Sequence, residues 1–157
     1  MLFRSGLVKS AIGIGALLCD GIGDTIRVSL TDDPVEEVDA AKQILRSVGM
    51  EGQYGMDLVS CPTCSRTKID LIPLVKRFEE AIRQTGLDKL PIKVALMGCV
   101  VNGPGEAREA DVGIAGGLHE AVLFRHGEIV EKKIPEDQII DRLIREIREI
   151  ASQMGKA

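Results

Sequence analysis

The chain has 157 residues, 45% of them apolar, and its 24 acidic and 20 basic residues give a formal net charge of −4. This length and apolar content suffice for one ordinary domain or two small ones, and they exclude a disordered chain. The basic residues form no block, and aromatic residues make up only 3% of the chain, so the sequence offers neither the charge nor the stacking surfaces of a nucleic-acid-binding protein.

The first twenty residues share some features with an export signal. Basic residues precede an apolar run over residues 11–19, but Lys9 and Ser10 stand directly before that run and no A-x-A cleavage pattern follows it. The run is also too short to span a bilayer. We therefore expect an interior helix over residues 8–21, reduced thiols, a cytoplasmic location and no membrane partner.

The first fifty residues predict a helix, a strand and a second helix. The strand, "DTIRVSLT" at residues 24–31, is β-branched and alternates apolar with polar side chains. The second helix, within residues 32–49, begins at acidic residues and a proline and ends at Gly49. Such an αβα unit is typical of parallel-sheet proteins, yet a single strand makes no sheet.

The second half predicts a compact α+β domain over residues 57–157, separate from an αβα unit over residues 1–52. Its expected elements are a helix over 70–85 ended by Gly86, strands within 92–101 and 111–117, a hairpin turning at His126 and Gly127, and a final helix from Pro135 to Met154.

Three of the four cysteines have the spacing of metal ligands. Cys61 and Cys64 form a C-x2-C motif, Cys99 follows in "MGCVVNGPGEAR", and Cys19 lies far back in an apolar stretch. The three thiols have three interpretations: buried cysteines without a ligand role, a zinc site, or an iron–sulfur cluster.

A cluster is favoured over zinc by the surroundings of these thiols. A structural zinc site requires four nitrogen or sulfur ligands, and neither His119 nor His126 belongs to a paired ligand motif. The glycine-rich turn at residues 103–105, beside Cys99, exposes backbone N–H groups of the kind that donate hydrogen bonds to cluster sulfides.

Three cysteines leave a fourth iron without a protein thiolate. Glu106, beyond the glycine-rich turn, is the nearest carboxylate able to fold back onto the site. A carboxylate binds iron more weakly than a thiolate and is displaced more easily. By spacing alone, however, Glu106 is better explained as an ordinary solvated acid.

Four segments together resemble a known family. "GIGDTIRVSL", "DPVEEV", "SCPTCSRT" and "MGCVVNGPGEAREAD" are similar to the C-terminal part of the 4-hydroxy-3-methylbut-2-en-1-yl diphosphate synthases, iron–sulfur enzymes of the methylerythritol phosphate route to isoprenoids. The resemblance implies a [4Fe–4S] cluster whose ligands are Cys61, Cys64, Cys99 and Glu106. It leaves Cys19 as a core residue.

The resemblance also gives an expectation for the first half of the chain. In the family a TIM barrel precedes the cluster domain, so residues 1–50 would be an α/β remnant, the last helix–strand–helix of that barrel. Lys9 and Ser10 would open a helix, and Arg27 and Ser29 would lie on the last strand. These four residues are the expected contacts of the substrate diphosphate. Only one of the eight barrel strands would then be present.

The activity implied by the resemblance is a two-electron reduction. The complete enzyme opens 2-C-methyl-D-erythritol 2,4-cyclodiphosphate and removes a hydroxyl, giving 4-hydroxy-3-methylbut-2-enyl diphosphate, with flavodoxin or ferredoxin as electron donor. Asn102 is a candidate to hydrogen-bond substrate or sulfide, or simply forms its turn. The full-length enzyme is expected to be a homodimer. The alternative is a non-catalytic metal- or cluster-binding module, and we expect this chain alone to be inactive.

Overall fold

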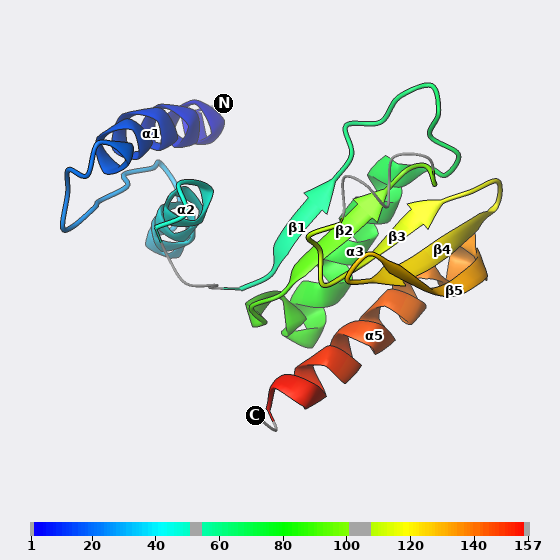
Figure 1. Cartoon of the computed structure of the whole chain (residues 1–157). Coiled ribbons are helices and arrows are strands. Elements are labelled where there is room, and N and C mark those ends of the chain that lie inside the picture. Colours follow the sequence, from blue (N-terminus) through cyan, green and yellow to red (C-terminus); the bar gives the residue numbers. More distant parts are fainter. Residues whose placement is uncertain (1, 51–54, 101–107, 156–157) are drawn as a thin grey trace. The chain divides into compact units, whose positions relative to one another are not determined.

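The computed structural model describes residues 2–50, 55–100 and 108–155, with side chains described from residue 5 onward. The chain divides into two compact units, Met1–Tyr54 and Gly55–Ala157, which we describe separately (Figure 1). In the described ranges, no helix is both long enough and apolar enough to cross a membrane.

The first unit consists of two helices and the segment that joins them. Helix α1 spans Leu2–Cys19 and helix α2 spans Pro34–Ser47. The Asp33 carboxylate accepts a hydrogen bond from the Val35 backbone N–H at 2.9 Å, and Pro34 follows as the first helical residue, so α2 begins where the sequence predicts. The small core of this unit contains Leu18, Val28, Ala40 and Ile44.

The strand expected at residues 24–31 does not form. The alternation is present, since Val28 is buried while Arg27 and Ser29 are exposed, but no strand pairs with this segment in the described chain. The Leu30 backbone N–H instead donates to the Glu37 carboxylate at 2.8 Å. A strand needs a partner for its backbone groups, and the described residues of the first unit offer none.

The second unit is built on one five-stranded mixed sheet. The strands follow one another in the order β1-β2-β3-β4-β5, and each pairs with the strand next to it in the sequence. Strands β1, β2 and β3 run parallel to one another. Strand β4 pairs antiparallel with β3, and β5 pairs antiparallel with β4. Their bounds are Asp57–Ser60, Lys93–Met97, Val112–Gly116, Glu120–Arg125 and Glu128–Pro135.

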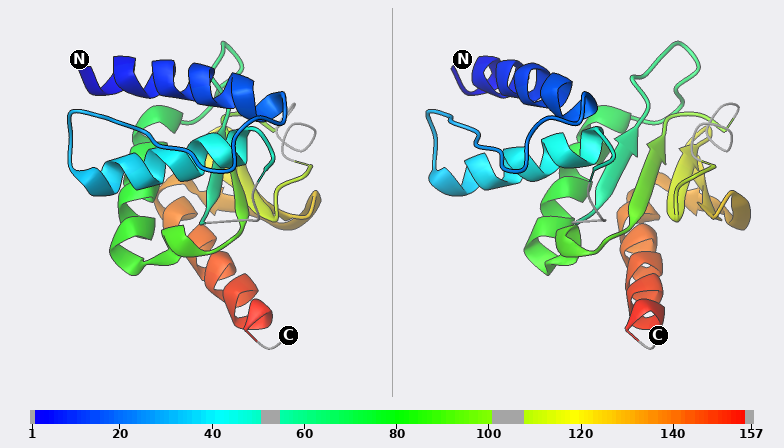
Figure 2. Two further views of the ribbon diagram at one scale, coloured as in Figure 1. Left: turned by 90° about the vertical axis from the view of Figure 1, so that its left-hand side faces the viewer. Right: turned by 60° about the vertical axis from the view of Figure 1, so that its left-hand side comes forward.

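Two long helices pack on the same face of this sheet (Figures 1 and 2). Helix α3 spans Leu71–Thr85 and helix α5 spans Ile139–Met154, each with a short 3₁₀ turn beside it, Leu87–Lys89 and Glu136–Gln138. Gly86 ends α3 with a φ of 70°. Both expected helices are therefore confirmed. The main core lies between them and the sheet, and its largest fully buried members include Leu74, Phe78, Leu96, Ile114, Leu123, Leu143 and Ile147.

The opposite face of the sheet carries a second, smaller cluster of buried residues. Ala95, Met97, Ala110, Ala115 and Phe124 make up this cluster. Gly113 of β3 is paired with Phe124 of β4. A Cβ atom at position 113 would lie 2.4 Å from the Phe124 ring, so the ring occupies the space that only glycine leaves free.

The expected hairpin is confirmed at its predicted turn. His126 and Gly127 join β4 to β5 with φ angles of 48° and 80°. Two central residues with positive φ define the type I′ geometry that matches the twist of a two-residue hairpin.

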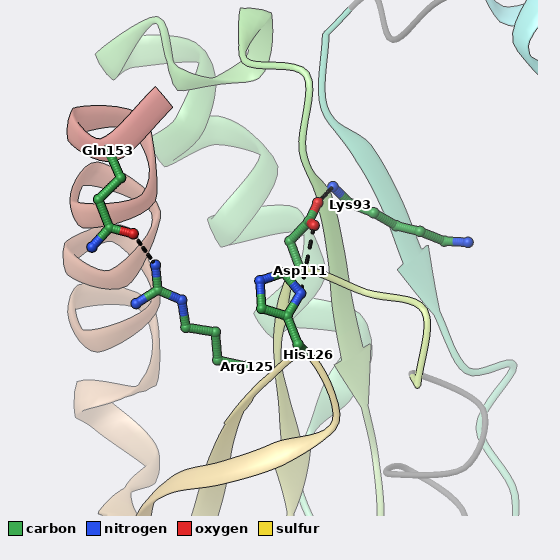
Figure 3. A network of polar contacts seen from close by, with 5 residues as sticks. All are labelled: Lys93, Asp111, Arg125, His126 and Gln153. Carbon is green, nitrogen blue, oxygen red and sulfur yellow. Dashed lines mark hydrogen bonds and ion pairs between the residues drawn. The ribbon is translucent and has the colours of Figure 1, made fainter. Parts of the chain in front are cut away.

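A polar network ties this hairpin turn to the amino ends of the parallel strands (Figure 3). The Asp111 carboxylate accepts the Lys93 backbone N–H at 2.7 Å and lies 3.8 Å from His126 Nδ1. Nearby, Arg125 donates to Gln153 of α5 at 2.7 Å. The network stands at the end of the sheet opposite the cysteines.

Candidate functional site

Two of the predicted ligand cysteines follow the carboxyl ends of neighbouring parallel strands. Cys61 comes directly after β1, and Cys99 lies two residues beyond the end of β2. Ser60 of β1 is in register with Leu96 of β2. Side chains just beyond such paired ends lie at one edge of a sheet, which is where parallel-sheet proteins place their functional groups.

Cys61 is already held against the second ligand segment. Its backbone N–H donates to the Leu96 carbonyl at 3.2 Å, and its sulfur accepts a hydrogen bond from the Gly98 backbone N–H at 3.3 Å. A donor directed at sulfur stabilises a thiolate, which is the form that binds metal. Cys61 is half-buried, so this contact is partly shielded from water.

Cys64 lies on an exposed turn that its own neighbours close. The Cys64 backbone N–H donates to Thr67 Oγ1 at 3.0 Å, and the Thr67 backbone N–H donates to the Cys64 carbonyl at 3.0 Å. Hydrogen bonds from the Arg66 backbone and then from the Arg66 side chain lower the pKa of the Cys64 thiol below its usual range. Thr63, between the two cysteines, adopts a left-handed φ of 58°.

The segment between the C-x2-C motif and α3 crosses the ends of β2 and β3. The Lys68 backbone N–H donates to the Gly98 carbonyl at 2.9 Å. A Cβ atom at Gly116, the last residue of β3, would lie 2.7 Å from the buried Ile69 side chain. Glycine at both strand ends is what permits this close approach.

The donor set fits a thiolate-ligated cluster, although the ligands are not assembled as one. Cys61 and Cys64 each have N–H donors directed at sulfur, and Cys99 is half-buried at the adjoining strand end. Within residues 2–50, 55–100 and 108–155, no three His, Cys, Asp or Glu side chains form a group that could hold a metal ion. The expected fourth ligand Glu106 and the candidate Asn102 lie outside the described residues.

The structure corrects three placements expected in the first unit. Lys9 and Ser10 lie inside α1 rather than opening a helix, because the helix begins at Leu2. Arg27 and Ser29 are exposed on a segment that forms no strand. Cys19 ends α1 and is exposed, so it is not a core residue; the core it was expected to join is limited to the two helices and their connection.

The fold and the site define a two-part chain with a mixed α/β domain that carries thiols at the carboxyl ends of its parallel strands. Comparison with known families matches residues 57–149 to the GcpE protein C-terminal domain and residues 2–42 to the GcpE TIM-barrel domain. The first match covers more than half of the chain. The chain therefore belongs to the GcpE family, as its resemblance predicts.

Relatives of known name agree with this assignment. A 4-hydroxy-3-methylbut-2-en-1-yl diphosphate synthase (flavodoxin) of Clostridium perfringens is 57% identical over 145 residues, covering 92% of this chain and 40% of the relative. Enzymes of the same name from Geobacillus thermodenitrificans and Caldanaerobacter subterraneus are 53% and 55% identical, covering 95% and 96% of this chain and 38% and 41% of the relatives. The chain thus spans about two fifths of the length of these relatives.

Sequence reasoning identified the thiols but missed the residues that hold them. Thr67, Gly98 and Gly116 make the close contacts between the C-x2-C segment and the strand ends. The only signal available was a glycine directly before Cys99, which we attributed to the strand. Local sequence patterns do not indicate which segments thirty residues apart will pack closely together.

Proposed function

We propose that this chain provides the cluster-binding part of a 4-hydroxy-3-methylbut-2-en-1-yl diphosphate synthase. Cys61, Cys64 and Cys99 supply three thiolate ligands to a [4Fe–4S] cluster, and Glu106 supplies the fourth ligand. The assignment of the cluster follows from the resemblance of the motifs, and the donor chemistry at the strand ends supports it.

One observation carries the proposal. The Gly98 N–H, one residue before Cys99, donates to the sulfur of Cys61 at 3.3 Å. This contact links the two cysteine-bearing segments through the atom that would bind iron. If the cysteines were only buried residues without a shared ligand, a backbone N–H beside Cys99 would not be expected to donate to the thiol of Cys61.

In the complete enzyme, the cluster would deliver electrons one at a time and offer one iron as a Lewis acid. The residues of this chain would hold its position and charge. The Gly98 backbone N–H donates to the Cys61 sulfur, and the Arg66 backbone N–H donates to the Cys64 sulfur and lowers the pKa of that thiol. Because the carboxylate of Glu106 is a weaker iron ligand than a thiolate, we assign it the exchangeable position.

The reaction and its partners proposed next belong to the full-length enzyme. We propose reduction of 2-C-methyl-D-erythritol 2,4-cyclodiphosphate by two electrons from a flavodoxin, the donor in the names of the relatives, within a homodimer. Lys9, Ser10, Arg27 and Ser29 remain candidates for diphosphate binding. Of these, Lys9, Arg27 and Ser29 have exposed side chains in this chain, as a contact to a soluble anion requires.

Metal and sulfide analysis of anaerobically purified or reconstituted protein tests the proposal. We expect a brown protein with about four irons per chain. Cys61→Ser, Cys64→Ser and Cys99→Ser should lose the colour, whereas Cys19→Ser, the matched control, should keep it. Bound zinc in place of iron, or loss of colour in Cys19→Ser with retention in Cys99→Ser, would contradict the ligand assignment.

Two further measurements separate cluster binding from turnover. Glu106→Ala should retain most of its iron, because three thiolates still hold the cluster, and should change the spectrum of the iron it ligates. The chain alone, given a reductant and the cyclic diphosphate, should form no measurable product, because the binding groups that would position the substrate are largely absent. Product formed at the rate of a full-length relative would refute this division of roles.

A further inference from the structure

Thr67 joins the two segments that carry the cysteines. Its hydroxyl accepts the Cys64 backbone N–H at 3.0 Å, and its own N–H donates to the Cys64 carbonyl at the same distance. These two reciprocal bonds close the turn on which Cys64 lies. The Thr67 side chain is half-buried, although its neighbours in this turn are exposed.

The other side of Thr67 contacts Gly98, which is buried beside Cys99. A Cβ atom at position 98 would lie 2.7 Å from Thr67 Cγ2 and 2.9 Å from Thr67 Oγ1. The two residues therefore touch with no room for a methyl group between them. Gly98 in turn donates its N–H to the Cys61 sulfur and accepts the Lys68 N–H at its carbonyl.

These contacts form a closed set around the ligand thiols. Thr67 fixes Cys64, Gly98 fixes Cys61 and precedes Cys99, and the contact between Thr67 and Gly98 fixes the distance between the two segments. A shift of either segment would change the positions of Cys61 and Cys64 relative to Cys99. Ligands held before the metal arrives lose less conformational freedom on binding it.

We propose that Thr67 is a positioning residue that sets the spacing of the three cysteine ligands through its contact with Gly98. The inference rests on the proposed cluster-binding function and adds residues that bind no iron themselves. Its hydroxyl orders the Cys64 turn, and its methyl group sets the approach to Gly98. The two groups can be removed separately, because Thr67→Val keeps the branched shape and Thr67→Ser keeps the hydroxyl.

The role of the hydroxyl is tested first in the metal-free chain by amide hydrogen exchange. Loss of a hydrogen bond of ordinary strength should speed exchange of the Cys64 amide in Thr67→Val by about two- to tenfold. Thr67→Ser should stay within about twofold of the unmodified chain. Thr85→Val is the matched control, since Thr85 donates to Ala81 within α3. Unchanged exchange at Cys64 in Thr67→Val would overturn the proposal without reference to any cluster.

The role of the spacing is tested by a pair of compensating substitutions. Gly98→Ala should reduce cluster loading about tenfold or more, because a new methyl group is forced against Thr67. The double variant Gly98→Ala with Thr67→Ala removes both close contacts and leaves the two Cβ atoms 3.2 Å apart, so it should recover much of the loading. Because contacting residues compensate and independent residues add, additive losses in the double variant would show that Thr67 and Gly98 do not set one shared contact and would overturn this part of the proposal.

The spectrum and reduction potential of the loaded cluster complete the test. We expect the electron paramagnetic resonance signal and the potential to shift in Thr67→Val and to remain unchanged in Thr85→Val. If the unmodified chain binds no iron and sulfide, the proposed function is wrong and the role of Thr67 toward a cluster falls with it. If the unmodified chain loads and Gly98→Ala loads equally well, only the positioning role of Thr67 is overturned.

Discussion

Gly113→Ala should strongly destabilise the second unit. A Cβ atom at this position would lie 2.4 Å from Phe124 Cζ and 2.5 Å from the Ala95 carbonyl oxygen. Phe124 is 1% exposed and cannot swing aside into solvent, and the carbonyl belongs to the backbone of β2. Neither neighbour can relieve the contact by a side-chain rotation.

The magnitude follows from the kind of atoms involved. Adding a methyl group to a packed core costs about 1–3 kcal/mol. Because a backbone atom must move here, we expect the upper end of that range, about 3 kcal/mol, which is roughly a hundredfold in the folding equilibrium.

Amide hydrogen exchange in β2 and β3 measures this change directly. The slowest amides of these strands should exchange roughly a hundredfold faster in Gly113→Ala. Adding Phe124→Leu relieves only the ring contact, so the double variant should lose less stability than the sum of the two single variants. An increase in exchange below about threefold would show that the sheet accommodates the methyl group and would refute the argument.

Three further changes test other local arguments. Asp111→Ala leaves the Lys93 N–H without its acceptor and should lower the free energy of unfolding by about 1–2 kcal/mol, measured by urea titration; an unchanged free energy would show that this hydrogen bond does not stabilise the sheet. Thr63→Gly removes a β-branched residue from a left-handed conformation and should stabilise the metal-free chain by up to about 1 kcal/mol. Gly13→Ala, with open space around it within α1, should raise helix stability by about 1 kcal/mol, seen as increased circular dichroism; a decrease would show a hidden contact.

Elements whose signals are local were predictable from the sequence. The hairpin was found at His126 and Gly127 because the turn itself requires residues that tolerate positive φ. The helix ended by Gly86 was found for the same reason. The final helix was found from its apolar period, although it begins at Ile139 after a 3₁₀ turn rather than at Pro135.

Elements that depend on distant partners were missed or misplaced. Strand β1, Asp57–Ser60, has only four residues, and its pairing with β2 gives it the strand conformation. Residues 24–31 have the composition of a strand but lack such a partner, so they form none. Lys9 and Ser10 were expected to open a helix because of the family resemblance, whereas α1 begins at Leu2.

The apolar residues of α2 are not all buried. Val35 is 64% exposed and Val38 53% exposed, while Ala40 is buried. The period of a sequence gives the direction of an apolar face but does not supply a surface to cover it. The candidate site shows the same difference between local signals and distant contacts. The C-x2-C motif identifies cysteines from local sequence, whereas no local pattern predicts the contact of Thr67 with Gly98.

The consecutive order of the five strands bears on how the ligand segments come together during synthesis. Each strand pairs with the one made just before it, so the sheet can extend one strand at a time as the chain leaves the ribosome. The backbone contact from Cys61 to Leu96 needs only β1 and β2, both of which precede β3, β4 and the final helix in the chain. A nascent chain ending shortly after Cys99 would already contain all three thiols, with Cys61 and Cys99 just beyond the ends of two strands that pair with each other.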